Sequence, residues 1–137
     1  MTKVGAGQAV IDLLVEEGVS HIFGIVGSSF LDILDATYER EDIGFIGVRH
    51  EQAAALMADG FSRISGKPAV CLVTNGPGVL NLTYGVASAY VAHSPVVVLA
   101  PSASREHQYR ESTQEFDQVS LFRPITKASF PVNKIER

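Results

Sequence analysis

Apolar residues follow two different spacings along this chain, and the two spacings alternate. Four stretches carry apolar residues every three to four positions, which predicts helices, and they are residues 4–18, 30–38, 51–66 and 79–92. Four short runs are continuously apolar, which predicts buried strands, and they are residues 21–26, 43–48, 69–73 and 95–99. Beyond them we expect a polar surface loop over 101–115, a short helix over 116–122 and a weaker fifth strand over 128–132. Continuously apolar strands that alternate with helices indicate an α/β fold, a parallel sheet with helices on both faces.

Individual residues refine the expected helices. Gly66 is expected to end the third helix, and Ser28 and Ser29 are expected to cap the second. The third helix is expected to bury one face, which carries Ala54, Met57, Ala58, Phe61 and Ile64. The fourth is expected to bury Val79, Leu82, Val86 and Tyr90.

Composition limits the class of protein. A length of 137 residues suits one domain, so residues 1–137 are assigned to a single domain. With 46% hydrophobic and 19% charged residues the chain is not disordered, and a net charge of −4 gives no reason to expect nucleic acid or anionic lipid as a partner. The single cysteine, Cys71, excludes disulfide frameworks. The N-terminus does not resemble a signal peptide and no apolar run reaches about 18 residues, so we expect a soluble cytoplasmic protein without a membrane span.

Three small-residue turns and one carboxylate follow the predicted strands. Gly27 and Ser28 follow the first strand, Glu51 follows the second, and Gly76 and Pro77 follow the third. Each of these features could also have a purely structural role, since tight turns favour glycine and a carboxylate is favourable at a helix N-terminus. Because open parallel sheets bind ligands at the carboxyl ends of their strands, the four features together predict a ligand site at this edge.

Two shorter motifs resemble known binding motifs but lack residues that those motifs require. The Gly5-Ala6-Gly7 segment lacks the third glycine and the preceding strand of a dinucleotide fingerprint. The His50-Glu51 pair begins like a zinc-protease helix, but Ala54 stands where the second histidine is required. We therefore assign no metal ligand in this chain.

Longer motifs carry a resemblance to a known family. The segments Arg49-His50-Glu51-Gln52-Ala53-Ala54, Met57-Ala58-Asp59-Gly60-Phe61-Ser62-Arg63, Thr74-Asn75-Gly76-Pro77-Gly78-Val79-Leu80-Asn81 and Thr113-Gln114-Glu115-Phe116-Asp117 stand in the family's order and spacing. They resemble the pyrimidine-binding domain of thiamine-diphosphate enzymes, in the acetolactate synthase group. This resemblance implies a flavodoxin- or Rossmann-like domain without its last helix and strand. Asn75 and the segment Gly24-Ile25-Val26-Gly27-Ser28-Ser29 are most similar to the sulfoacetaldehyde acetyltransferase branch.

The resemblance implies roles for individual residues. Glu51 matches the glutamate that hydrogen-bonds N1′ of the aminopyrimidine ring and promotes the tautomer that generates the reactive ylid. Gln114 matches a glutamine that faces the reacting end of the cofactor. The matches to residues that line the cofactor cleft or the subunit interface are Gly27, Ser28, Gly76, Pro77 and Asn81. The implied reaction transfers a two-carbon acyl unit from a 2-oxo acid or from sulfoacetaldehyde.

The resemblance also implies partners. The family holds Mg²⁺ and the diphosphate on a separate domain that starts with Gly-Asp-Gly, a sequence absent from this chain. We therefore expect a diphosphate-binding domain in the same or another chain, a homodimer or homotetramer, and no activity from this chain alone. The chain is expected to be either a piece of a longer enzyme or a split subunit, and FAD binding stays open. Acetolactate synthase, 2-oxo acid decarboxylase and a non-catalytic interaction domain remain alternatives.

Overall fold

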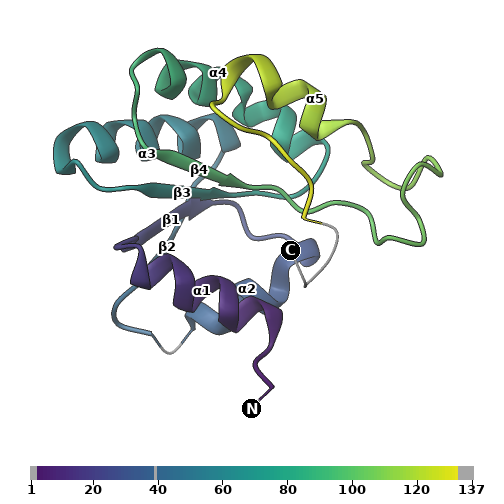
Figure 1. Ribbon diagram of the computed structural model, residues 1–137, viewed down its shortest axis with the longest axis horizontal. Coiled ribbons are helices and arrows are strands. Elements are labelled where there is room, and N and C mark those ends of the chain that lie inside the picture. Colours follow the sequence, from purple (N-terminus) through teal and green to yellow (C-terminus); the bar gives the residue numbers. More distant parts are fainter. Residues whose placement is uncertain (1–2, 39, 133–137) are drawn as a thin grey trace.

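The computed structural model describes residues 3–38 and 40–132, in which strands and helices alternate along the chain (Figure 1). The strands are β1 (His21–Gly24), β2 (Gly44–Gly47), β3 (Ala69–Leu72) and β4 (Val96–Leu99). The helices are α1 (Ala6–Glu16), α2 (Leu31–Thr37), α3 (Glu51–Ser65), α4 (Pro77–Val91) and α5 (Gln118–Phe122), with 3-10 turns at Ser28–Phe30 and Arg123–Ile125. Each strand lies within the apolar run that predicts it, and α3 ends at Gly66 in the left-handed conformation, as expected.

The strands form one parallel sheet in the order β2-β1-β3-β4. Helices α1 and α2 cover one face, and α3, α4 and α5 lie on the other (Figure 1). The prediction of an α/β fold, with a parallel sheet and helices on both faces, is confirmed.

Alternate residues of β3 face two separate hydrophobic cores. Val70 and Leu72 pack with Ile11 and Ile22 beneath α1 and α2. Cys71 belongs to the other core, formed with α3, α4 and α5. All four residues of β3 are buried, because this strand has a neighbour on each side and helices over both faces.

Close packing of α3 on α4 depends on a glycine. A Cβ atom at Gly85 of α4 would overlap the side chain of Ala55 on α3. Small residues therefore let these two helices approach closely, and this contact sets the relative position of residues near their N-termini, including Glu51 and Asn81.

Several local predictions are wrong. Residues 128–132 form no strand; the segment packs back on α5, where Ser129 Oγ donates to the carbonyl of Val119. Neither Ser28 nor Ser29 caps α2. The expected buried faces were too wide, because Met57, Ile64 and Tyr90 are exposed. The small residues Ala54, Ala55, Ala58 and Ser62 form the buried side of α3 instead.

Candidate functional site

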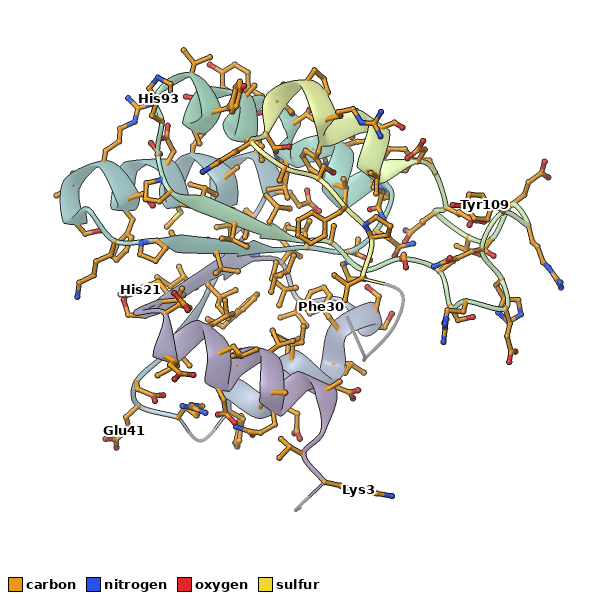
Figure 2. All side chains as sticks on the ribbon, viewed as in Figure 1. Lys3, His21, Phe30, Glu41, His93 and Tyr109 are labelled. Atoms are coloured by element: carbon orange, nitrogen blue, oxygen red, sulfur yellow. The ribbon has the colours of Figure 1, made fainter. Side chains whose placement is uncertain are left out.

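The topology brings the turns after β1, β2 and β3 to one edge of the sheet. Since β1 lies between β2 and β3, the chain crosses in opposite directions after β1 and after β2. Open parallel sheets bind ligands at the carboxyl ends of the strands beside such a reversal, here β1 and β3. Phe30 lies toward this edge, whereas His21 and His93 lie toward the opposite end of the molecule (Figure 2). His93 is therefore not part of the candidate site.

Side chains join the turn after β1 to the turn after β3. Ser29 Oγ lies 3.3 Å from Thr74 Oγ1, and Thr74 Oγ1 donates to Asn75 Oδ1 at 3.3 Å. A Cβ atom at Gly27 would lie 2.9 Å from the ring of Phe30 and 3.3 Å from Thr74. The turn after β1, which carries the predicted site residue Ser28, is thus closely packed at Gly27 and exposed at Ser28.

Glu51 is the first residue of α3, and its carboxylate meets α4. Asn81 Nδ2 donates a 2.9 Å hydrogen bond to Glu51 Oε2. Within residues 3–38 and 40–132, no hydrogen bond reaches Glu51 Oε1. His50 precedes the helix and accepts the Gln52 N–H on Nδ1 at 3.2 Å, a capping role that the sequence analysis missed. Glu51 is half-buried, and one of its two carboxylate oxygens is held by Asn81.

The turn after β3 packs against Gln114, and its contact point at Gly76 is here called the Gly76 seat. Gly76 has φ 66° and ψ −113°, a conformation that favours glycine. A Cβ atom at Gly76 would lie 2.5 Å from the carbonyl oxygen of Gln114 and 2.7 Å from its Cβ. Asn75 Nδ2 lies 3.4 Å from the carbonyl oxygens of both Thr113 and Gln114. Pro77 then begins α4, at a position where proline is well tolerated.

Glu115 organises the loop that carries Gln114. Its carboxylate accepts the backbone N–H groups of Ser112 (3.0 Å), Tyr109 (2.6 Å) and Arg110 (3.3 Å). These bonds, with that of Ser112 foremost, lower the pKa of Glu115 below its ordinary value. Tyr109 stands near the tip of the loop, which projects from the layered body at the carboxyl edge (Figure 2).

Four of the predicted site residues thus form two contacting pairs, and Gly27 and Ser28 belong to neither pair. Glu51 pairs with Asn81, and Gly76 packs against Gln114. Among the described residues no hydrogen bond joins the two pairs. Sequence reasoning missed Asn75 and Glu115 as site-organising residues. Glu115 belongs to the motif Thr113–Asp117, but no sequence pattern in a polar loop shows which acidic residue will accept backbone N–H groups.

A second polar cluster lies in the interior on α3. Asp59 is 4% exposed and accepts two hydrogen bonds from Arg63, at 2.8 and 2.7 Å, and further ones from Ser88 and Ser94. The Arg63 guanidinium is the main cause that lowers the pKa of Asp59, and the two serine hydroxyls add to it. These bonds satisfy the buried carboxylate and tie α3 to α4 and to the segment before β4.

Two further properties of the described part of the chain bear on function. Within it, no three or more histidine, cysteine, aspartate or glutamate side chains gather in a way that could hold a metal ion. None of its helices has both the length and the apolar character required to cross a membrane.

Residues 4–121 match the family described as "Thiamine pyrophosphate enzyme, N-terminal TPP binding domain". The chain belongs to this family. The resemblance seen in the motifs around Glu51 and Gly76 is therefore confirmed.

Individual relatives come from two groups of enzymes. The chain is 43% identical over 136 residues to the acetolactate synthase large subunit of Buchnera aphidicola subsp. Acyrthosiphon pisum, covering 99% of this chain and 24% of the relative. It is 45% identical over 129 residues to a probable acetolactate synthase large subunit of Methanocaldococcus jannaschii, covering 94% and 22%. It is 42% identical over 125 residues to the sulfoacetaldehyde acetyltransferase of Alcaligenes xylosoxydans xylosoxydans, covering 91% and 21%. The chain thus spans less than a quarter of the length of these relatives.

Proposed function

We propose that residues 1–137 form a single domain, and that this domain activates the cofactor in a thiamine-diphosphate-dependent enzyme. The observation that carries the proposal is the placement of Glu51, at the carboxyl edge of a parallel sheet, with Oε2 held by Asn81. Its other carboxylate oxygen is left to meet a ring nitrogen. In the alternative, a non-catalytic interaction domain, the bond between Asn81 and Glu51 would only tie α4 to α3.

Glu51 is the residue at this edge that we propose meets an aromatic ring. Gly76 is covered by Gln114 and Gly27 packs against Phe30, so the two glycine turns are proposed to border the ring rather than to lie under it. Glu51 offers the acceptor or shared proton that a protonatable ring nitrogen needs. When bound, thiamine diphosphate supplies an electron sink for carbanion chemistry.

Each residue then has a distinct part. Glu51 shares a proton with the ring nitrogen in a hydrogen bond, and Asn81 keeps the Glu51 carboxylate in one orientation. Gly76 and Pro77 shape the turn that packs against Gln114, while Gly27 and Ser28 form the neighbouring turn after β1. Gln114, whose side chain is exposed in the described chain, faces the reacting end and the substrate.

The proposed enzyme needs a second domain. We assign the diphosphate and its Mg²⁺ to a diphosphate-binding domain in the same or another chain, within a homodimer or homotetramer. Leu80, Tyr84 and Val91 follow one another along α4 at helical spacing and are 50%, 64% and 78% exposed. This apolar stripe begins beside Asn81 and supports a covering domain or subunit next to the candidate site.

The substrate is proposed to be a 2-oxo acid or sulfoacetaldehyde, from which a two-carbon acyl unit is transferred. The Gly24–Ser29 segment and Asn75 favour sulfoacetaldehyde. Acetolactate synthase is the second candidate, supported by relatives of 43% and 45% identity. Simple decarboxylation of a 2-oxo acid would give free aldehyde instead.

The test uses the complete assembly that contains this chain and the diphosphate-binding part. Pyruvate and sulfoacetaldehyde are supplied in turn, with phosphate present, and acetolactate, acetyl phosphate and free aldehyde are quantified. Glu51→Gln is expected to lower thiamine-diphosphate-dependent turnover by about a hundredfold or more, since general acid–base groups contribute about that much. The matched control is Glu41→Gln, because Glu41 is an exposed glutamate far from this edge (Figure 2). Wild-type turnover in Glu51→Gln would refute the proposal.

A further inference from the structure

Residues 101–117, here called the Gln114 loop, are held mainly by their own hydrogen bonds. The loop leaves β4 and returns to α5, and Gln118 Nε2 closes its base by donating to the Pro101 carbonyl at 2.8 Å. Ser112 Oγ donates to the His107 carbonyl at 2.7 Å inside the loop. A loop closed and filled in this way can hold a fixed shape without belonging to the sheet or to a helix.

The backbone at Gln114 is in a conformation that its surroundings must impose. Its φ is 63°, in the left-handed region that residues with a Cβ atom rarely adopt. Tyr109 and Glu111, earlier in the loop, share this property with φ of 62° and 55°. Such conformations persist where neighbouring contacts determine them.

Two side chains, Asn75 and Glu115, supply contacts to the loop backbone at and just before Gln114. Asn75 offers its side-chain amide to the carbonyl oxygens of Thr113 and Gln114. The Glu115 carboxylate accepts hydrogen bonds from the N–H groups of Ser112, Tyr109 and Arg110. The seat is Gly76, where a side chain would collide with Gln114. Backbone donors of residues 109, 110 and 112 and the carbonyls of Thr113 and Gln114 thus all have side-chain partners.

We infer that Asn75 and Glu115 are positioning residues, which fix the backbone of Gln114 on the Gly76 seat and so aim its side chain at the reacting end of the cofactor site. The inference rests on the proposed function for its catalytic consequence. The immobilisation of Gln114 itself does not depend on that function. Neither Asn75 nor Glu115 needs to touch cofactor or substrate.

The first test measures motion. Backbone hydrogen exchange is followed in the complete assembly for Asn75→Asp, which keeps the side-chain shape but replaces the donor by an acceptor, and for Glu115→Gln. We expect exchange at Gln114 and Glu115 to rise about tenfold or more, while exchange in β3 stays unchanged. The control is Gln108→Ala, because Gln108 bonds Ser102 and Ala103 near the base of the loop. Unchanged exchange at Gln114 and Glu115 in both variants would overturn the inference.

The second test asks whether Asn75 and Glu115 act through Gln114. Asn75→Asp and Glu115→Gln are each expected to lower kcat about ten- to a hundredfold, as misplacement of a positioned group does. When Gln114 has already been replaced by alanine, each of the two substitutions is expected to lower kcat by less than about twofold further. Equal losses in both backgrounds would overturn the inference while the proposed function stands. Wild-type turnover in Glu51→Gln would instead refute the proposed function and leave the exchange result intact.

Discussion

Asn81 on α4 donates a 2.9 Å hydrogen bond to Glu51 at the start of α3, and this bond joins two residues thirty positions apart. It exists because α3 and α4 pack closely, with Gly85 of α4 against Ala55 of α3. The carboxylate that we assign to cofactor activation is therefore oriented by the helix packing beneath it.

Removal of this bond should free the Glu51 carboxylate to rotate. We expect Asn81→Ala to lower kcat of the complete enzyme by about tenfold, the size expected for loss of one oriented hydrogen bond to a charged group. The midpoint of urea unfolding should stay close to that of the wild type, because Asn81 is exposed. Thr83→Ala is the control, since Thr83 bonds a carbonyl of its own helix and does not touch Glu51. Steady-state kinetics on both variants checks this, and equal rates would contradict the assigned role.

Gly76 should not tolerate a side chain. Gly76→Ala combines a left-handed φ of 66° with a collision against Gln114. We expect a loss of about 1–3 kcal/mol in the free energy of unfolding, measured by urea denaturation. Gly44→Ala is the matched control, because a Cβ atom at Gly44 meets nothing within 4 Å. If both variants unfold at the same urea concentration, the proposed Gly76 seat is wrong.

Asp59 should make stability depend on acid pH. Its folded-state pKa lies below the ordinary value of 3.8, chiefly because of Arg63, so its contribution is present above about pH 4 and is lost as pH falls through the lowered pKa. Asp59→Asn should lower the free energy of unfolding by about 1–3 kcal/mol at pH 7, since a neutral amide replaces the buried carboxylate that accepts from Arg63, Ser88 and Ser94. The same substitution should reduce the difference in unfolding free energy between pH 7 and pH 3. Asp35→Asn, an exposed aspartate, is the control. An undiminished pH dependence in Asp59→Asn would show that other groups cause it.

Cys71 should be chemically inert in the folded protein. Burial raises the pKa of its thiol to about 12, so almost no thiolate exists at pH 8. A thiol reagent is therefore expected to label the native protein very slowly and the urea-unfolded protein at once. Rapid stoichiometric labelling of native protein would place Cys71 outside the core.

The sequence predicts the sheet well because the central strands β1 and β3 are largely buried and all four strands lie within apolar runs. The location of Glu51 and Gly76 at one edge of the sheet could also be predicted, since parallel strands share one carboxyl edge. The bond between Glu51 and Asn81 and the seat of Gln114 could not be predicted from spacing. They depend on how closely α3 meets α4 and on how a polar loop folds back, and neither leaves a periodic pattern.

The failed predictions have local causes. Residues 128–132 are apolar enough for a strand, but Ser129 ties the segment to α5. Met57, Ile64 and Tyr90 fit a helical stripe, yet small residues fill the tight contact between α3 and the elements around it. Apolar spacing alone does not distinguish a face buried within this domain from one left exposed.

The most direct test of the central claim measures proton exchange on the cofactor. The complete assembly is loaded with thiamine diphosphate and diluted into heavy water, and loss of the C2 proton is followed by NMR for wild type, Glu51→Gln and Glu41→Gln. Our account predicts wild-type exchange in Glu41→Gln and exchange slowed by about a hundredfold or more in Glu51→Gln. Wild-type exchange in Glu51→Gln would contradict the role of Glu51 as the activating residue.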